Sequence, residues 1–513
     1  MRRPILLLAL LLLPLSAGCL FFSDHLIDDA YIFFRYADHI LAGQGPVFNP
    51  GERVEGFTSP LWLLLLVLLR GLGLPHAISV RVLGGALAAL TLFATWRLAR
   101  RCARPLPALL APALLACHPG FALWSVRGLE TPLFLLAVTS AAGLAASGSR
   151  AAGPLLGLLI WIRPEAPLIA LILILGTAAR GERKRAWRMV SWVLLGALPL
   201  LAARFAYYGE WVPNTFFAKT GGGAGRLLFG LAAAKSFALA HSPLVVATAV
   251  GARLVMRGRA RDSERPVLIE WLLIGLAWSA WVVWAGGDAF YGFRFWLPAL
   301  PFASAICAWA LSRLTEAGGV SGAEQLPDLT RRRVAAFGIG VVIVGGCAAL
   351  SFREARFEQV TGGEFTERML AAGRWLKTTA PPGTTMALNY VGALPWASGL
   401  PAIDMLGLTD KAVARTPIRG RFRFTGHARG NGASVLDRRP DLLLMNGVWV
   451  DPEPLGVLAP QLDSEEQIAA DARFAAEYGR EDVRIPGPRG SGPADEMWFV
   501  FWRRRDAAWD PTP

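Results

Sequence analysis

The strongest constraint on the fold is a series of apolar segments, most of them nearly as long as a membrane-spanning helix. A helix needs about 20 apolar residues to cross the hydrocarbon core of a bilayer. With 54% hydrophobic and only 18% charged residues, the chain is too apolar for a set of soluble domains. We therefore predict a polytopic α-helical membrane protein. The segments that meet or approach the required length are 5–22, 77–96, 105–121, 131–147, 151–162, 166–179, 189–206, 227–256 (one span with an interfacial lead-in), 267–285, 293–313 and 334–351.

Basic residues recur between the apolar segments and set the predicted orientation. The net charge is +14, and many of the positive residues gather in short clusters within 97–101, 180–188, 253–265 and 331–333. Short loops rich in Lys and Arg remain on the cytoplasmic side of a membrane. A nucleic-acid partner is disfavoured, because the positive residues do not form one stripe on a folded domain.

Segment 59–74 decides the predicted number of spans. It is apolar enough to cross, but counting it would place the basic cluster after residue 96 outside and invert every later loop. We therefore place it along, or only partly into, the outer leaflet. The result is about 11 spans, with the N-terminus in the cytoplasm and the C-terminus outside. The expected location is the plasma (inner) membrane of a bacterium.

The hydropathy drops after Ser351, where proline, glycine and charged residues become more frequent. We predict a membrane domain over 1–351, with a first outer loop at 23–58, and a soluble extracytoplasmic domain over 352–513. This second domain is expected to be a small α/β or α+β unit. Its predicted elements are a helix near 364–378 and strands near 384–390, 441–446 and 496–503. No internal repeat supports an inverted-repeat transporter.

Paired carboxylates follow directly after the first apolar segment. Asp28 and Asp29 lie among aromatic residues and beside Arg35. A carboxylate in such a partly buried wall at a membrane surface is costly and is functional by default. The alternative is a solvated cap on the end of a span. Glu130 is a second outer acid, but it precedes Thr131-Pro132, which is also an ordinary helix start. The candidate catalytic residues are Asp29, Asp28 and Glu130.

Cationic and polar side chains occur on the other predicted outer segments. Arg contacts phosphate oxygens bidentately and Lys acts as a point charge, so a lipid phosphate would suit them. The candidates for a donor phosphate are Arg163, Lys219 and Arg294, and those for other substrate contacts are Arg35, Tyr31, Asn214, Asp288 and His427.

Some of these residues, and two acids of the outer domain, also have a structural interpretation. Arg163 and Glu165 could simply neutralise each other, and Asp404, Asp410 and His427 could only hold the outer domain together. The five cysteines show no zinc or disulfide spacing. No nucleotide-binding loop, HExxH or GxSxG element stands in a convincing context. ATP, nicotinamide and serine-hydrolase chemistry therefore have no support.

Several sequence blocks run in order over roughly residues 24–446, each weak alone and specific together. They are Asp28–Tyr36, Phe48–Glu52, Glu55–Thr58, Gly128–Leu133, Arg163–Glu165, Tyr208–Gly209, Pro213–Thr215, Ala218–Lys219, Gly286–Asp288, Arg294–Phe295, Ile403–Asp410 and Gly426–His427. In these blocks the chain resembles the GT-C membrane glycosyltransferases. More narrowly, it resembles the branch containing the bacterial cell-wall arabinofuranosyltransferases.

The resemblance implies an inverting sugar transfer from a polyprenyl-phosphate donor to a hydroxyl of a cell-envelope glycan or lipid. It implies a general base on the first outer loop, a role that falls on Asp29 with Asp28 as partner or alternate. Glu130 matches a second-loop acid by position. The sugar suggested by the branch is a pentofuranose such as arabinofuranose. Some GT-C enzymes use a divalent metal, and Asp28 and Asp29 could offer oxygens to Mg²⁺ or Ca²⁺.

Two other functions remain open at this point. A lipid-linked-sugar transporter or flippase would also be polytopic, but its acids would be expected in broken helices at mid-membrane. A non-catalytic glycan-binding scaffold would not need the full set of acids and cations. The clustering of the acids on one predicted face favours the transferase.

Overall fold

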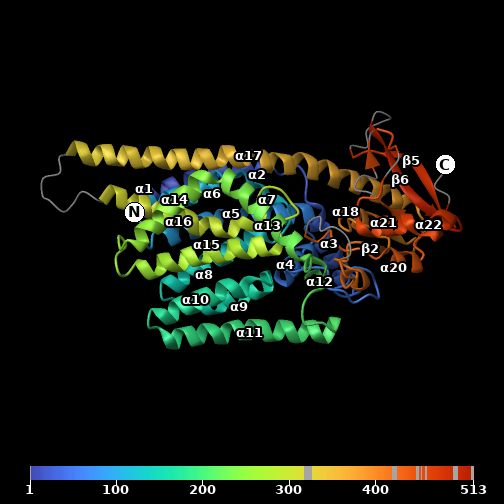
Figure 1. Cartoon of the computed structure of the whole chain (residues 1–513), viewed down its shortest axis with the longest axis horizontal. Coiled ribbons are helices and arrows are strands. Elements are labelled where there is room, and N and C mark those ends of the chain that lie inside the picture. Colours follow the sequence, from blue (N-terminus) through green and yellow to red (C-terminus); the bar gives the residue numbers. More distant parts are fainter. Residues whose placement is uncertain are drawn as a thin grey trace. The chain divides into compact units, whose positions relative to one another are not determined.

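The computed structural model describes residues 2–316, 326–418, 425–445, 450–451, 453–456, 459–488 and 495–509. The chain divides into two compact units, each built from separate stretches of sequence. The first comprises Met1–Asp24, Val80–Leu200 and Gly230–Gln359, and the second comprises His25–Ser79, Leu201–Phe229 and Val360–Pro513. Figure 1 shows the elements of both units, coloured along the chain.

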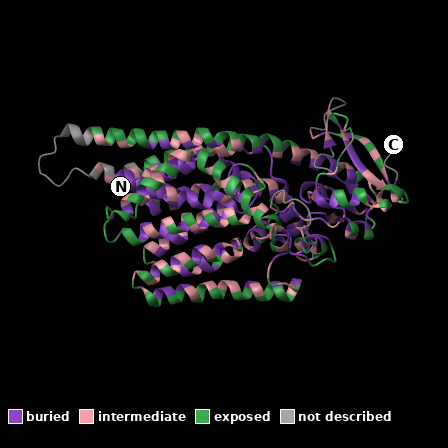
Figure 2. Cartoon of the chain, viewed as in Figure 1, coloured by how far each residue is buried: buried purple, intermediate pink, exposed green. Residues whose placement is uncertain are grey.

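The described residues of the first unit form helices joined by turns and loops. Among its helices long enough to cross a membrane, the one containing α16 (Leu300–Glu316) is the most buried. It packs against α6, α14 and α15, while most side chains of α11 are exposed (Figure 2). The elements that lie wholly or partly in this unit are α1 (Arg2–Leu10), α2 (Leu12–Phe21), α5 (His76–Ala99), η1 (Pro107–Leu109), α6 (Leu110–Ala116), α7 (Pro119–Val126), α8 (Thr131–Ala146), α9 (Ala152–Ile162), α10 (Ala166–Ala179), α11 (Arg183–Tyr208), α13 (Gly223–Ala240), α14 (Ser242–Met256), α15 (Arg265–Ala285), η2 (Arg294–Ala299), α16 and α17 (Leu326–Thr379).

Membrane-spanning capacity follows from the length and composition of these helices. Among the described residues, five helices are long and apolar enough to cross a bilayer, or up to seven if each of two bent helix pairs is one span. Five shorter apolar helices of 10–17 residues accompany them. The chain is a multi-pass membrane protein, and about 11 spans remains a prediction.

Most predicted apolar segments are helices, with differences from expectation at two bends and at the domain boundary. Segment 105–121 contains a 56° bend between α6 and α7, and segment 227–256, expected to be one span with an interfacial lead-in, forms α13 and α14, which meet at a 91° bend. Ser242-Pro243 starts a new helix there, because proline fits the first turn of a helix and cannot continue the preceding one. The predicted domain boundary at 351/352 lies inside α17, which continues to Thr379 and contains the helix expected near 364–378.

The second unit holds a mixed sheet with the order β2-β1-β3-β6-β4, in which β5 also pairs with β6. The pairs β1–β2 and β1–β3 are parallel, and β6 runs antiparallel to β3, β4 and β5. The sheet packs against helices around a core that includes Ala387, Leu443 and Ile468. The strands are β1 (Met386–Leu388), β2 (Ala402–Asp404), β3 (Leu442–Leu444), β4 (Val450–Asp451), β5 (Tyr478–Pro486) and β6 (Glu496–Arg504).

The expected strands near 384–390, 441–446 and 496–503 correspond to β1, β3 and β6. Sequence reasoning missed β2, β4 and β5. It also missed that the first outer loop forms part of the same unit as the sheet. The helices of this unit are α3 (Asp28–Leu41), α4 (Pro60–Gly71), α12 (Asn214–Lys219), α18 (Ala393–Ser398), α19 (Lys411–Ala414), α20 (Gly432–Asp437), α21 (Asp463–Ala470) and α22 (Ala472–Glu477).

Segment 59–74 is represented by α4, a 12-residue helix packed against α3. Trp62, Leu63 and Leu66 are buried on one side of it, whereas Leu64 and Leu68 are exposed. At about 1.5 Å per residue the helix is shorter than the hydrocarbon core is thick. Its position in the outer leaflet stays a prediction.

Candidate active site

Asp28 and Asp29 occupy the first turn of α3, so the paired acids begin a helix and do not lie in an irregular loop. Asp28 is buried, and its carboxylate accepts N–H groups from Gly392 at 3.1 Å and from Ala393 at 2.7 Å. Asp29 is less buried. The two neighbours therefore differ: both oxygens of Asp28 hold the start of α18, while Asp29 is more accessible.

Burial raises the pKa of Asp28 to about 7. The N–H groups of Ala393 and Gly392 oppose this increase, because hydrogen bonds to a carboxylate favour its charged form. The negative charge of Asp29 adds to it. Asp28 is therefore protonated in a large fraction of molecules at neutral pH.

Arg35 lies on α3 and is almost fully buried. Its guanidinium donates to the carbonyl oxygens of Phe48 at 2.7 Å and Leu400 at 2.9 Å, to that of Pro395, and to Asn49 Oδ1 at 3.3 Å. These bonds join α3 to the following loop, to α18 and to the segment after α18. They give Arg35 a structural role and offer no support for the predicted substrate contact.

Asn214 is also committed to the protein itself. Its side-chain amide donates to the carbonyl oxygens of Gly407 at 2.7 Å and Leu408 at 3.0 Å, and its backbone N–H donates to Glu55 O at 3.0 Å. Glu55 is buried and paired with Arg204 through two hydrogen bonds of 2.5 and 2.9 Å. The predicted substrate contact of Asn214 likewise gains no support.

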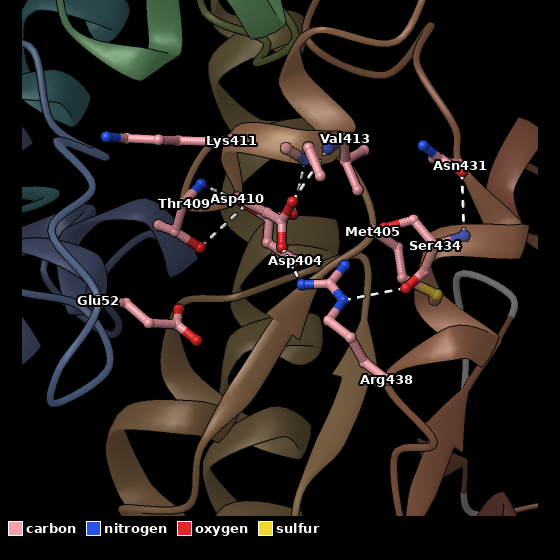
Figure 3. Close-up of polar contacts among 12 residues, drawn as sticks. Glu52, Asp404, Met405, Thr409, Asp410, Lys411, Val413, Asn431, Ser434 and Arg438 are labelled. Carbon is pink, nitrogen blue, oxygen red and sulfur yellow. Dashed lines mark hydrogen bonds and ion pairs between the residues drawn. The ribbon is translucent and has the colours of Figure 1, made fainter. Parts of the chain in front are cut away.

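The acids of the sheet unit hold a turn after β2 (Figure 3). Asp404 accepts backbone N–H groups from Leu406 at 2.8 Å, Gly407 at 3.0 Å and Thr409 at 2.7 Å. Asp410 accepts the N–H of Val413 at 3.0 Å and pairs with Arg438. Of the two interpretations left open by the sequence, these contacts favour the structural one for both acids.

Lys219 and His427 lie close together, although they are far apart in sequence. The side chain of Lys219 passes Gly426, where a Cβ would lie 3.8 Å from Lys219 Cγ. Burial lowers the pKa of His427 to about 4, and the positive charge of Lys219 contributes to the decrease. The Tyr390 ring lies 6.2 Å from the His427 ring. The structure thus places a cation beside a neutral imidazole and a phenol.

Tyr31 belongs to the same unit. Its ring is buried between those of Phe34 and Trp396, at centroid distances of 5.2 and 5.1 Å. This packing accounts for the aromatic character of the site wall.

In the first unit, Arg163 lies between two carboxylates. It donates to Glu130 at 2.8 Å and to Glu165 at 2.7 Å, and all three side chains are nearly buried. Its guanidinium also lies over the rings of Phe134 and Phe295. The predicted neutralisation of Arg163 by Glu165 is present, and Glu130 takes part in it.

Arg294 forms a bidentate ion pair with Asp288, with both bonds at 2.8 Å. The preceding turn requires glycine, since Gly286 and Gly287 have φ values of 87° and 78°. The guanidinium also lies over the rings of Trp124 and Phe295. Arg163 and Arg294 are thus held in fixed orientations by carboxylates and aromatic faces.

A further arginine of this unit was missed by the sequence reasoning. Arg81, in the second turn of α5, lies near Arg127, which pairs with Asp24 at 3.2 Å. Within the described parts of the chain, the buried Nε of Arg81 has no hydrogen-bond partner. The signal in the sequence was a lone arginine near the start of an otherwise apolar segment.

One of the paired acids has both carboxylate oxygens committed to the protein, which limits what the pair could offer a divalent metal. Ca²⁺ takes six to eight oxygen ligands, whereas Mg²⁺ takes six, often one or two carboxylates with waters and phosphates. Both carboxylate oxygens of Asp28 already accept backbone N–H groups. Across the described residues, no group of three or more His, Cys, Asp or Glu side chains could hold a metal ion. We therefore assign no step to a metal.

Two proteins with related sequences carry the same name, terminal beta-(1->2)-arabinofuranosyltransferase. The one from Corynebacterium glutamicum is 34% identical over 231 residues, covering 38% of this chain and 33% of the relative. The one from Mycobacterium tuberculosis is 31% identical over 273 residues, covering 47% and 42%. The chain spans about a third to two fifths of the length of these relatives. Residues 354–499 match a domain of unknown function (DUF8728).

Two solved structures share the fold at low sequence identity. ArnT from Cupriavidus metallidurans, bound to undecaprenyl phosphate, aligns with a TM-score of 0.55 and 13% identity over 97% of both chains. The oligosaccharyltransferase AglB from Archaeoglobus fulgidus, in complex with an inhibitory peptide and a dolichol-phosphate, aligns with a TM-score of 0.53 and 13% identity over 78% of this chain and 64% of AglB. The chain has a GT-C-like fold.

The resemblance inferred from the sequence is therefore confirmed for the fold, and the named relatives are arabinofuranosyltransferases. The roles of individual residues remain predictions. The sequence reasoning missed the pairing of Glu55 with Arg204, because its two partners lie 149 residues apart.

Proposed function

We propose that the protein is an inverting glycosyltransferase of the outer face of a bacterial plasma membrane. It would move a sugar, a pentofuranose such as arabinofuranose, from a polyprenyl-phosphate donor to a hydroxyl of a cell-envelope glycan or lipid. The names of the related sequences support the sugar class. The lipid phosphates named with the structural neighbours support the donor class.

The main support for the proposal is that Asp28 and Asp29 differ in burial and in hydrogen bonding. A transferase needs one carboxylate that can approach an acceptor hydroxyl, and this carboxylate must be held in a fixed orientation. Asp28 fixes the orientation of the first turn of α3, because its two oxygens accept N–H groups at the start of α18. Asp29 follows on the same turn and is the more accessible of the two. We therefore assign the general base to Asp29.

In the proposed reaction one bond forms, one bond breaks and one proton is transferred. The acceptor oxygen forms a bond to the anomeric carbon from the face opposite the phosphate, and the bond from that carbon to the phosphate oxygen breaks. The proton of the acceptor passes to Asp29, and the leaving group is the polyprenyl phosphate. A positioned base contributes typically 10²–10⁴-fold to such a step. Fixed cations stabilise the charge that develops on the leaving group.

The candidates for donor-phosphate binding are Arg163, Lys219 and Arg294, to which we add Arg81. A phosphate approaching Arg163 or Arg294 would meet a guanidinium already paired with carboxylates. Arg81 has a buried Nε without a partner in the described chain, so it has unused hydrogen-bonding capacity. A buried arginine N–H without a partner is costly, and an anionic ligand would offset that cost.

The test uses the full-length protein in nanodiscs with synthetic polyprenyl-phosphate pentoses and hexoses and a mixed glycan acceptor. We expect acceptor-dependent release of polyprenyl phosphate that falls at least 100-fold in Asp29→Asn, because the base is lost. Asp38→Asn removes another carboxylate of α3 and should retain activity within a few fold.

Two results would contradict the proposal. If no donor releases polyprenyl phosphate while lipid scrambling or glycan binding is intact, the protein is a flippase or a scaffold. If Asp28→Asn is inactive and Asp29→Asn is nearly normal, the two roles are reversed.

A further inference from the structure

Two bent helix pairs of the first unit each carry a histidine at the bend. His118 lies between α6 and α7, which are bent by 56°, and His241 lies between α13 and α14, which are bent by 91°. The two Nε2 atoms are 2.7 Å apart, and the rings are stacked with centroids 5.0 Å apart. Both side chains are buried. A hydrogen bond between two histidines thus joins the two bends directly.

The partners of the other ring nitrogens define the tautomer of each histidine. His118 Nδ1 accepts the backbone N–H of Phe121 at 3.0 Å, so in the neutral ring the proton is on Nε2. His241 Nδ1 lies 2.9 Å from the carbonyl oxygen of Phe237, which can only accept, so this nitrogen carries the proton. His118 Nε2–H therefore donates to His241 Nε2. Every ring nitrogen is satisfied with both rings neutral.

Aromatic contacts connect the pair to Arg294. The His241 ring packs against Phe237 at 4.2 Å and against Phe293 at 5.1 Å, and Phe237 stacks on Trp296 at 5.1 Å. Phe293 directly precedes Arg294 in the chain, and Trp296 follows it by two residues. Phe293 has φ +58°, a left-handed conformation that is uncommon without glycine and that surrounding packing must hold.

Close backbone packing next to His118 supports the same region. A Cβ on Gly120 would lie 3.1 Å from His118 Cε1 and only 2.4 Å from the carbonyl oxygen of Gly292. A Cβ on Gly292 would lie 2.9 Å from Leu123 Cδ2. The start of α7 is therefore pressed against the loop that ends in Arg294. The same helix ends at Val126, immediately before Arg127.

We infer that His118 and His241 are positioning residues, which fasten the two helix bends to each other and thereby fix the loop carrying Asp288 and Arg294. The consequence for sugar transfer rests on the proposed function, whereas the fastening itself does not. A polar pair buried inside a membrane protein is costly unless fully satisfied. The pair meets this condition through a single chain of hydrogen bonds that crosses from one bend to the other.

The first test measures the pair directly in the wild-type protein in nanodiscs. With ¹⁵N-labelled histidine, we expect one ring protonated at Nε2 and another at Nδ1, with a scalar coupling across the N–H···N bond. The chain has six histidines, and His118→Asn identifies the signals. Asparagine can still accept the Phe121 N–H but is too short to reach His241. Absence of the coupling in the wild type would overturn the inference.

The second test follows the loop itself by hydrogen–deuterium exchange over residues 286–300. We expect His118→Asn, His241→Phe and the double variant to increase exchange to the same extent, because either change removes the one shared bond. Cys117→Ala alters the neighbouring residue at the same bend and should leave exchange unchanged. Unchanged exchange in the histidine variants would contradict the inference, even if the wild type transfers sugar.

If the wild type is active, the same variants should lower kcat by about 10- to 100-fold through misplacement of the charged groups. The double variant should lose no more than the single ones, since the two residues act as a unit. An inactive wild type that retains the coupling and the exchange effect would refute the proposed function and leave the positioning role intact. A strictly additive double variant would refute the positioning role.

Discussion

At the scale of single residues, the close approach of Gly392 to Asp28 explains how one of two adjacent acids is fixed. A Cβ at Gly392 would lie 2.0 Å from the Asp28 carbonyl oxygen and 2.4 Å from its Oδ2. Gly392→Ala must therefore push α3 away from α18. We expect it to lower the thermal unfolding midpoint by several degrees and to lower any transferase activity.

Gly456→Ala is the matched control for this prediction, because a Cβ there would meet nothing within 4 Å. Its unfolding midpoint should equal that of the wild type. Equal midpoints for Gly392→Ala and Gly456→Ala would show that Asp28 is not held as described. The comparison is made by differential scanning fluorimetry of the protein in detergent or nanodiscs.

From the buried carboxyl of Asp28 we also expect the free energy of unfolding to depend on pH. Burial raises the pKa of its carboxyl to about 7, compared with about 3.9 in an unfolded chain. The folded state thus binds the proton more tightly. The resulting stabilisation is complete below about pH 4 and is lost as the pH rises through 7, by at most about 1.4 kcal/mol per pH unit.

Asp28→Asn removes this titration and provides the reference. The unfolding midpoint of the wild type, relative to that of Asp28→Asn at the same pH, should fall between pH 4.5 and 7.5. Taking the difference removes the effect of Asp404, whose pKa is also raised by burial, to about 6. A difference that is constant or rises with pH would show that burial does not raise the pKa of Asp28.

At the scale of elements, glycines set how closely the helices of the first unit approach. A Cβ at Gly84 of α5 would lie 1.9 Å from the carbonyl oxygen of Ser125 on α7, whereas a Cβ at the next residue, Gly85, would meet nothing within 4 Å. Gly84→Ala should therefore destabilise the protein. Gly85→Ala should be neutral, or stabilising by up to about 1 kcal/mol through helix propensity.

Because the two glycines are adjacent on one helix, the pair separates packing from propensity. Thermal unfolding of both variants gives the answer. Similar midpoints for the two variants would show that α5 and α7 do not approach closely at this position.

The helices also show how much of the fold could be predicted from the sequence. Hydropathy identified the apolar helices because each residue in such a segment contributes to the same local signal. The bends were not identified, although His118-Pro119 and Ser242-Pro243 each contain the proline that starts a new helix. A local signal such as proline marks the start of a helix, but it does not give the angle between that helix and the preceding one.

For the candidate site, the sequence identified the acids but not what holds them. Asp28 and Gly392 are 364 residues apart in the sequence, Arg35 and Leu400 are 365 apart, and Asn214 and Gly407 are 193 apart. No local pattern carries such pairings. Arg35 is an example: an arginine beside two aspartates suggested a substrate contact, and its bonds to the carbonyl oxygens of Phe48 and Leu400 could not be inferred from the sequence.

At the scale of the whole molecule, the number of membrane spans decides on which side of the bilayer each loop lies. In the described part of the chain, five helices are long enough to span, or up to seven with the bent pairs, and several shorter apolar helices accompany them. The orientation therefore depends on which short helices cross. The positive-inside rule supplies an independent constraint, because all of the basic clusters should lie on one side.

Helix α4 decides this question, since it precedes the first basic cluster. If α4 crossed the bilayer, Arg97, Arg100 and Arg101 would lie outside, against the strong bias of Lys and Arg toward the cytoplasm. Its 12 residues would span only about 18 Å of a hydrocarbon core about 30 Å thick. We therefore expect a reporter fused after residue 74 to be extracytoplasmic and one fused after residue 104 to be cytoplasmic.

Paired phosphatase and fluorescent-protein fusions at these two sites measure the orientation, since each reporter is active on one side only. A third fusion, after residue 182, lies in another basic cluster and should match the one after residue 104. A cytoplasmic signal after residue 74 would mean that α4 crosses. The rule of basic loops would then fail at every later cluster, and the paired acids at the start of α3 would lie on a different side from the predicted sheet domain.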